Sequence, residues 1–378
     1  MTLFKKTYDI IFYYPQHFNR SEKGTNPFFD PLVAICEENG FSYLLVEEPD
    51  YKTTFPRNKK AVSFAFWLYT ILVLRKLIPT SFFKNNTQKE IFIGKIIALF
   101  TLNFFKAKTY ITISNSMIDV LLGFNDKARV FDLQHGIIYA KHPGYFQSDG
   151  TLNEFLNQER IGFLLTGEGF KESFQINNKL IANEKFVILG DPKSANLNIE
   201  LTFNKRVLIY TLLFTLDASE KELLEEKKEL QLFLSSFQKT AEKHSLSILL
   251  KHHPRYNNAI AISDILEQFP FATITNSNFE ELSKSVFLHL TKYSTSAFEL
   301  AKMTIPTVFI TNKIAESIFH DEYQYPNYNF TLEEWIELYF KNDPKFVILV
   351  EETKKWSSHF YEPFNKKLFL DLIQHNKN

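Results

Sequence analysis

The sequence predicts an α/β protein built from two Rossmann-like, doubly wound domains that face a central cleft. Three observations support this fold class. The chain has 378 residues, more than a single hydrophobic core usually serves. Short apolar runs alternate with helical patterns, which is typical of parallel sheets with helical crossovers. The alternation is interrupted once, at Gly190-Asp191-Pro192 and the polar stretch that follows.

The first series of elements opens with an apolar run that ends before Pro15, as a buried strand would. Gly40 closes the first helical pattern. The strands expected in this series are Tyr8–Tyr14, Phe41–Val46, Thr109–Ser114 and Ala128–Leu133. The helices expected are Pro31–Asn39, Lys60–Leu77, Lys89–Phe105 and Met117–Leu122.

The second series contains a long charged helix, Ser219–His244, which Ser219 and Glu222 begin as a capping box. The strands expected here are Phe186–Leu189, Arg206–Leu213, Leu246–Leu250, Ala272–Ile274, Val286–Leu290 and Thr307–Ile310. The other helices expected are Ile260–Phe269, Phe279–Ser285 and Thr295–Met303. We therefore divide the chain into a first domain at 1–185, a second at 186–350, and a C-terminal helix at 351–378 that packs back on the first domain.

Composition excludes several classes of protein. Hydrophobic residues make up 45% of the chain and aromatic residues 16%, which is too apolar for a disordered protein. The single cysteine, Cys36, rules out an internal disulfide framework and a cysteine-based metal site, and it fits a reducing compartment. The formal charge is zero, which disfavours a nucleic-acid partner. The start of the chain lacks the apolar run of a secretory signal, so we expect a cytoplasmic protein.

The zero charge hides a strongly basic segment at residues 51–108. It contains eleven Lys or Arg residues and one acid, Glu90, and aromatic residues are interleaved with the cations. This mixture suits an anionic membrane surface, and a peripheral position at the inner face of the plasma membrane would follow. The longest uncharged run, Ala61–Leu74, is 14 residues, too short to span a bilayer. Two core helices with solvated basic flanks would explain the pattern equally well.

Polar residues follow three of the expected strands, where ligands bind in doubly wound sheets. The first loop continues from Asp132 at the end of a strand and combines histidines that can act as bases with a glycine that permits close approach of a ligand. Its residues of interest are Gln134, His135, Gly136, His142 and Tyr145.

The second and third loops are rich in groups that bind anions. The second has adjacent histidines before a proline and an arginine, namely His252, His253, Pro254 and Arg255. The third places hydroxyl groups at the start of a helix, where free N–H groups attract phosphate; it contains Ser294, Thr295, Ser296 and Glu299. Ser296 and Glu299 also match a capping box, which would need no ligand.

Several common sites are absent from the sequence. It has no phosphate-binding P-loop motif, no nucleophile elbow and no glycine-rich dinucleotide fingerprint after the first strand. Adjacent histidines on a strand point to opposite faces and chelate a metal poorly. We therefore expect neither a metal nor a cofactor.

Together, the three loops resemble bacterial surface-polysaccharide glycosyltransferases of the two-Rossmann (GT-B) type. The His253-Pro254 pair and the Ser294-Thr295-Ser296 run are similar to the His-Pro and Ser-Ser motifs of sialyltransferases and Kdo transferases, which use CMP-sugars. The Gln134-His135-Gly136 loop is similar to that of polyol-phosphate polymerases, which use CDP-glycerol. The resemblance covers about residues 105–310, and Ser-Thr-Ser departs from the Ser-Ser pattern.

The resemblance implies an inverting, metal-independent transfer of a sugar from a CMP-activated donor to a surface-polysaccharide or lipid-linked glycan acceptor. His135 would be the general base, with Asp132 either an alternative base or the group that orients it. The first domain would bind the acceptor, using Gln134, Gly136, His142 and Tyr145. The second would bind the donor nucleotide, using His253, Pro254, Arg255, Ser294, Thr295, Ser296 and Glu299.

Three other functions stay open. The first is a CDP-polyol phosphotransferase of teichoic-acid type, and the second is a non-catalytic binding protein for polysaccharide assembly. A sugar-nucleotide epimerase of the same fold is less favoured, because such an enzyme needs no membrane face.

Overall fold

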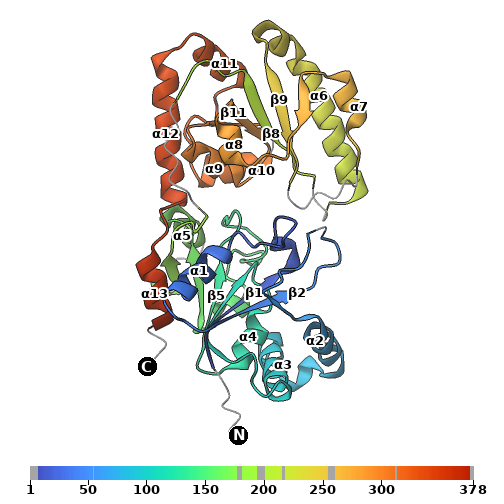
Figure 1. Ribbon diagram of the computed structural model, residues 1–378, viewed down its shortest axis with the longest axis vertical. Helices are drawn as coiled ribbons and strands as arrows, with labels where there is room; N and C mark the ends of the chain where they lie inside the picture. The colour runs from blue at the N-terminus through green and yellow to red at the C-terminus, as the bar shows by residue number, and fades with distance from the viewer. Residues whose placement is uncertain are drawn as a thin grey trace. The chain divides into compact units, whose positions relative to one another are not determined.

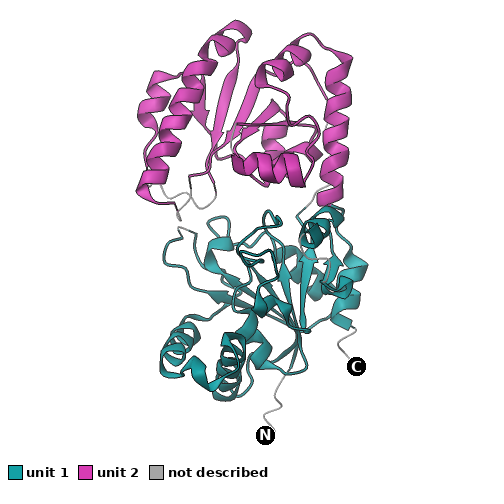
Figure 2. Cartoon of the chain, turned by 180° about the vertical axis from the view of Figure 1, so that it is seen from behind, with its two compact units in different colours: residues 1–194, 362–378 teal, residues 195–361 magenta. Residues whose placement is uncertain are grey.

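The computed structural model describes residues 7–53, 55–176, 181–193, 201–214, 218–253, 260–310 and 313–374. The chain forms two compact units (Figure 2). Unit 1 comprises residues 1–194 and 362–378, and unit 2 comprises residues 195–361. Each unit has its own parallel sheet, so the predicted α/β class with two Rossmann-like domains is confirmed.

Unit 1 contains a seven-stranded parallel sheet in the order β3-β2-β1-β4-β5-β6-β7 (Figure 1). Its strands are β1 (Tyr8–Pro15), β2 (Tyr43–Glu48), β3 (Val62–Ser63), β4 (Ala107–Ile113), β5 (Arg129–Leu133), β6 (Ile161–Leu165) and β7 (Phe186–Ile188). Nearly all residues of the central strands are buried, because helices cover both faces of a doubly wound sheet.

Most helices of unit 1 lie between its strands along the chain, whereas the last one comes after the residues of unit 2. They are α1 (Asp30–Glu38), α2 (Ala65–Leu77), α3 (Asn86–Phe100), α4 (Ile118–Phe124), α5 (Glu168–Ile176) and α13 (Lys366–Gln374). Short helical turns occur at η1 (Gln16–Phe18), η2 (Thr80–Phe82), η3 (Glu154–Asn157) and η4 (Asn183–Lys185). The core contains side chains from β1, α1 and β5, together with Phe369 and Ile373 of α13.

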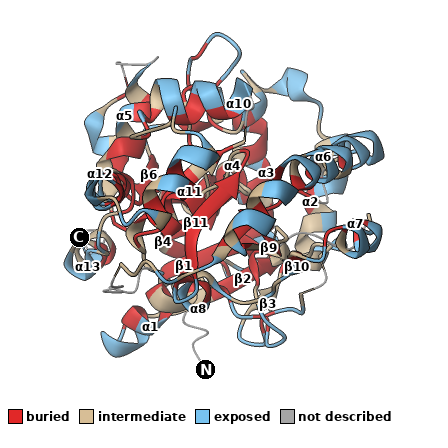
Figure 3. Cartoon of the chain, turned by 90° about the horizontal axis from the view of Figure 1, so that it is seen from above, coloured by how far each residue is buried: buried red, intermediate tan, exposed pale blue. Residues whose placement is uncertain are grey.

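Unit 2 contains a five-stranded parallel sheet in the order β10-β9-β8-β11-β12. Its strands are β8 (Val207–Thr211), β9 (Ser247–Lys251), β10 (Ala272–Ile274), β11 (Val286–Thr291) and β12 (Thr307–Phe309). Its helices are α6 (Glu220–His244), α7 (Ser263–Gln268), α8 (Phe279–Ser283), α9 (Ser296–Lys302), α10 (Lys313–Ala315), η5 (Glu316–Glu322), α11 (Leu332–Phe340) and α12 (Pro344–Phe360). The strands are mostly buried, whereas the helices present exposed residues outward (Figure 3).

The capping box predicted at the start of α6 is present: the Ser219 side chain accepts from the Glu222 N–H, and the Glu222 carboxylate accepts from the Ser219 N–H. The capping box predicted at Ser296 and Glu299 is wrong. Thr295 is the N-cap of α9, and its side chain makes no capping hydrogen bond. The Ser296 hydroxyl is instead directed to Ser294 and Thr211.

The sequence does not predict β6, α5 or α11, and three other boundaries differ from the expected ones. Residues 186–188 form β7, which pairs with β6 in the first sheet, so the division falls at 194 and not at 185. The expected helix at 60–77 begins only at Ala65, because Val62 pairs with Val46 to form β3. Residues 351–360 continue α12 within unit 2, and a separate helix, α13, lies in unit 1.

Candidate functional site

Each sheet has a point where the strand order reverses, and ligands of doubly wound proteins bind beyond the carboxyl ends of the strands there. In unit 1 this point lies between β1 and β4, and in unit 2 between β8 and β11. The backbone after β4 adopts left-handed conformations at Ser114 and Asn115, with φ of 61° and 55°. This turn brings the Asn115 N–H to Asp132 at the end of β5, at 2.8 Å from Oδ1.

Asp132 is a buried carboxyl group with two hydrogen-bond donors. Its Oδ1 accepts from Asn115, and its Oδ2 accepts from the Tyr145 hydroxyl at 2.8 Å. Burial raises the pKa of Asp132 to about 7, although both donors oppose the shift. Asp132 is 1% exposed and has no hydrogen bond to His135, so the structure does not place it as an orienting group for that histidine. It holds together the turn after β4 and the loop that carries Tyr145.

His135 lies just beyond β5 and is partly exposed. Its ring packs edge-on against Phe18, with the ring centres 5.0 Å apart, and its Nδ1 has no hydrogen-bond partner among the described residues. Burial is the main reason that the pKa of His135 falls to about 3, and the neighbouring groups His142, His17, Lys193 and Arg20 add to this shift. The imidazole is therefore neutral at pH 7. We call His135 and these four residues the His135 cluster.

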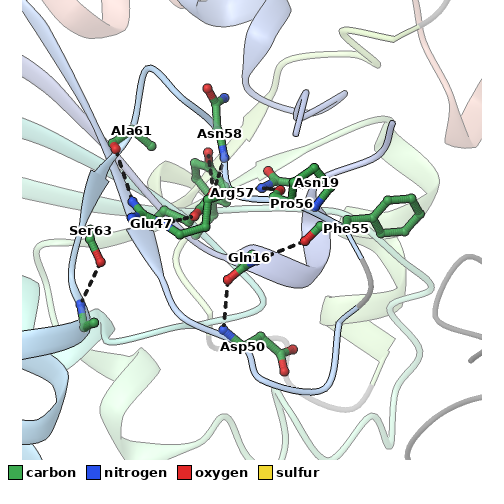
Figure 4. Close-up of polar contacts among 12 residues, drawn as sticks. Gln16, Asn19, Glu47, Asp50, Phe55, Pro56, Arg57, Asn58, Ala61 and Ser63 are labelled. Carbon is green, nitrogen blue, oxygen red and sulfur yellow. Dashed lines mark hydrogen bonds and ion pairs between the residues drawn. The ribbon is translucent and has the colours of Figure 1, made fainter. Parts of the chain in front are cut away.

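The segment that carries His17 and Arg20 is fixed by buried hydrogen bonds (Figure 4). Glu47, at the end of β2, is fully buried and accepts from the Asn19 amide at 2.8 Å and from Arg57 Nε at 2.8 Å. Gln16 donates to the Phe55 carbonyl at 2.9 Å, and His17 lies 2.6 Å from the Asp50 carboxylate. These contacts join η1 to the loop after β2 and hold the segment that carries His17 and Arg20 in place.

The remaining residues predicted in the first loop have mainly supporting positions. Gln134 is buried and accepts from the backbone and hydroxyl of Thr166, at 2.9 and 3.0 Å. His142 accepts from the Gly144 N–H at 3.0 Å, and its ring packs between Tyr139 and Tyr145. Gly136 does not have a positive φ, so the turn itself does not require glycine. A Cβ at Gly136 would meet no atom within 4 Å, so space for a ligand is open there.

A surface cavity of about 420 Å³ adjoins this region. Its lining comes from α2, α3, α4 and the turn after β4, and includes Arg75, Lys89, Glu90, Asn115 and Asp119. Arg75 donates from Nε to both carboxylate oxygens of Glu90, at 3.0 and 2.9 Å. One side-chain oxygen each of Asn115 and Asp119 is buried without a hydrogen-bond partner among the described residues. Burial and the charge of Glu90 raise the pKa of Asp119 to about 7.

In unit 2, polar residues end three neighbouring strands. Thr211 closes β8, Lys251 closes β9, and Ser294 follows β11. Lys251 donates to the Ser277 carbonyl at 2.6 Å, and burial lowers its pKa against the opposing charges of Glu281 and Glu299. The parallel sheet therefore brings these strand ends to one edge.

Beneath this edge lies a buried polar network around His289 of β11. The His289 Nε2 lies 2.9 Å from the Thr211 hydroxyl and 3.3 Å from the Ser296 hydroxyl, and its Nδ1 lies 2.8 Å from the Thr307 hydroxyl. Burial lowers the pKa of His289 to about 3, so the ring is neutral. Ser296 belongs to this network and is only 4% exposed. Of the predicted hydroxyl run, only Ser294 and Thr295 are partly exposed.

His252 and His253 follow β9 and are both partly exposed. The ring of His252 lies 6.1 Å from that of Phe214, and burial lowers its pKa. The predicted residues Pro254 and Arg255 lie outside the described residues. Within the described parts of the chain, no group of His, Cys, Asp or Glu has the arrangement of a metal site.

Sequence reasoning missed the cations of the His135 cluster and the network around His289. His17, Arg20 and Lys193 are far from His135 in the sequence, and only the sheet order brings them together. A usable signal existed, because Gln16-His17-Phe18-Asn19-Arg20 directly follows the first strand. The switch-point rule, applied to that strand, would have selected this segment.

Comparison with known proteins identifies the type of fold but does not assign the chain to a family. No family model matches the sequence, and no curated protein is similar to it. Among solved structures, the two-unit α/β arrangement matches GT-B proteins, so the chain has the GT-B-type fold.

The particular neighbours are remote. The wall teichoic acid polymerase TagF, as a variant, is 16% identical with a TM-score of 0.57, covering 98% of this chain and 88% of that one. The S. aureus MnaA structure with UDP is 10% identical with a TM-score of 0.51, covering 97% and 95%. A UDP-N-acetylglucosamine 2-epimerase assigned in Listeria monocytogenes is also 10% identical, with a TM-score of 0.51 and coverage of 98% and 95%.

Proposed function

We propose that this chain is a transferase that moves a group from a cytidine-nucleotide donor to a hydroxyl of a glycan or lipid-linked acceptor. The observation that carries the proposal is the His135 cluster: a neutral imidazole near the cations of Arg20 and Lys193, beyond the strand ends of a Rossmann-like unit. A neutral imidazole can take a proton, and the cations attract an anionic ligand. A bound phosphate would offset the cations and raise the low pKa of His135, which would make the imidazole a better general base for a phosphate-bearing substrate.

Unit 2 would bind the donor nucleotide. Ser294 and Thr295 follow β11 and are partly exposed. Lys251 ends β9, on the other side of β8, and His253 follows it. Hydroxyl groups and a cation can hold the phosphate and offset the charge that develops on the leaving nucleotide, without a metal. Ser296 supports this site from below, because its hydroxyl belongs to the His289 network.

In the reaction, His135 accepts the proton of the acceptor hydroxyl while the acceptor oxygen forms its new bond. If the donor is a CMP-activated sugar, the oxygen attacks the anomeric carbon, the bond to CMP breaks, and the configuration inverts. If the donor is a CDP-polyol, the oxygen attacks the distal phosphorus and forms a phosphodiester. CMP is the leaving product in both cases. The TagF neighbour, one of whose structures was soaked with CDPG, favours the second donor.

The acceptor would enter the cavity lined by α2, α3 and α4. The unpartnered oxygens of Asn115 and Asp119 can accept hydrogen bonds from hydroxyl groups of a glycan. Asn115 also holds Asp132 through its backbone, so the cavity is joined to the loop that bears His135.

The test combines thermal-shift binding of CMP, CDP and UDP with assays of CMP release from CMP-sugars and CDP-polyols. We expect CMP or CDP to protect the wild type, and His253→Ala to weaken this protection about tenfold or more in affinity. His135→Ala should abolish turnover but keep CMP affinity, and Asp119→Asn should raise KM for the acceptor alone. His320→Ala, an exposed site in unit 2, is the matched control.

Each contrary result has a distinct meaning. A large loss of CMP affinity in His135→Ala would remove that residue from the base role, and unchanged affinity in His253→Ala would remove it from the donor site. Protection by UDP alone would favour an epimerase-like function. No protection by any nucleotide would favour a non-catalytic binding protein.

A further inference from the structure

The largest concentration of exposed apolar side chains in the described residues lies on α2, η2 and α3. Among the large hydrophobic residues that the structure describes, every exposed aromatic side chain falls between Tyr51 and Phe104. Phe82 is 78% exposed, Leu99 72% and Phe66 70%. We call the surface formed by Phe66, Tyr69, Leu77, Phe82, Leu99 and Phe100 the apolar hairpin face.

The fold explains why these residues point outward. Ile71 is the buried residue of α2, and Phe66, Tyr69 and Val73 recur on the opposite side at helical spacing. Helix α3 packs closely against α4 through the side that contains Gly94. A Cβ at Gly94 would come within 2.2 Å of the Val120 carbonyl oxygen. Phe92, Lys95 and Leu99 recur at helical spacing on the side of α3 away from this contact, where each is exposed.

Cations are interleaved with this face. Lys76 at the end of α2 and Lys84 after η2 are exposed next to Leu77 and Phe82. The segment 51–108 carries a net charge of +10 in a chain of zero net charge, and four of its eleven cations pair with acids outside the segment. A protein partner of ordinary composition would not need both features, whereas an anionic bilayer takes aromatic side chains at its boundary and lysines at its headgroups.

We propose that the apolar hairpin face docks on an anionic lipid bilayer, with α2 and α3 lying in the plane of the interface. None of the described helices is long and apolar enough to cross a membrane, so contact would be peripheral. The same two helices line the cavity that contains Asn115 and Asp119, so docking would bring a lipid-linked acceptor to that cavity. The docking itself does not depend on the proposed transferase activity.

The experiment is flotation of the full chain with vesicles of phosphatidylcholine, alone or mixed with phosphatidylglycerol. We expect the wild type to float with the mixed vesicles at low salt and to be released by high salt. The variant Phe66→Ser/Phe82→Ser/Leu99→Ser should bind at least tenfold more weakly. Neutralising Lys76 and Lys84 to Gln should weaken binding about fivefold each, about 25-fold together, from about 1 kcal/mol per cation.

The matched control is Leu224→Ser/Leu232→Ser/Ile348→Ser, which removes three exposed apolar side chains from unit 2 and should float like the wild type. The variant His135→Ala should also float normally, which separates this proposal from the transferase proposal. Absence of flotation at low salt would overturn the proposal. So would flotation unaffected by the hairpin variants, or self-association that they abolish without any lipid binding.

Discussion

At the scale of single residues, burial decides what the ionisable groups of the candidate site can do. His135 and Asp132 are three positions apart in the sequence, yet the pKa of the histidine falls to about 3 and that of the carboxyl group rises to about 7. Both shifts favour neutral forms, because a charge loses its hydration when it is buried. Of the two side chains, His135 is partly exposed and Asp132 is enclosed, which is why we propose His135 and not Asp132 as the base.

The pKa of Asp132 makes a testable prediction about stability. Because its folded pKa lies above the ordinary value of 3.8, the carboxyl group contributes stability below about pH 4 and loses it as pH rises through about 7. The side chain in Asp132→Asn does not titrate. When the pH rises from 5 to 8, the wild type should therefore lose about 2 kcal/mol of unfolding free energy relative to this variant. Unfolding in urea at both pH values measures this difference. An equal gap between the two proteins at both pH values would contradict the shifted pKa.

At the scale of elements, helix contacts in unit 1 are set by small residues as well as by apolar patterns. Gly94 of α3 and Gly123 of α4 lie against each other's helices, and a Cβ at either position would come within 2.2 Å of a backbone carbonyl oxygen. The sequence shows both glycines in apolar helices, where glycine normally costs stability. Only the packed structure shows that the two glycines allow α3 and α4 to cross at short distance.

This crossing predicts that alanine is costly at two glycines and harmless at a third. Gly94→Ala and Gly123→Ala should each lower the free energy of unfolding by about 1–3 kcal/mol, because the helices must separate. Gly136→Ala is the control and should leave stability unchanged, since a Cβ there meets nothing. Thermal unfolding checks all three. Equal stability of Gly94→Ala and the wild type would show that the helices can move apart without cost.

At the scale of the whole molecule, unit 1 is built from two separate stretches of the chain, residues 1–194 and 362–378. The backbone of residue 191 donates to the Glu362 carbonyl at 3.0 Å, and the Asn365 N–H donates to the Leu189 carbonyl at 2.8 Å. These bonds attach the last helix, α13, to unit 1, while the helix before it belongs to unit 2.

Two buried phenylalanines close in sequence should therefore destabilise different units. Phe369→Ala removes a fully buried side chain from the core of unit 1, and Phe346→Ala removes one from the core of unit 2. Each should cost about 3–5 kcal/mol. Hydrogen exchange measured by mass spectrometry should show faster exchange in residues 7–193 for the first variant and in 201–361 for the second. The same exchange pattern in both variants would contradict the division.

The sequence by itself determined the fold class, most strand positions and the loops that follow them. Apolar runs of strand length, capping signals such as Ser219 and Glu222, and helical spacing are local properties, and local physics fixes them. The tertiary structure alone decided which loop residues are available. It buried Ser296 in the His289 network, enclosed Asp132, and joined His17, Arg20 and Lys193 to His135. The physical reason is that burial and charge proximity depend on strand order, which connects residues distant in the sequence.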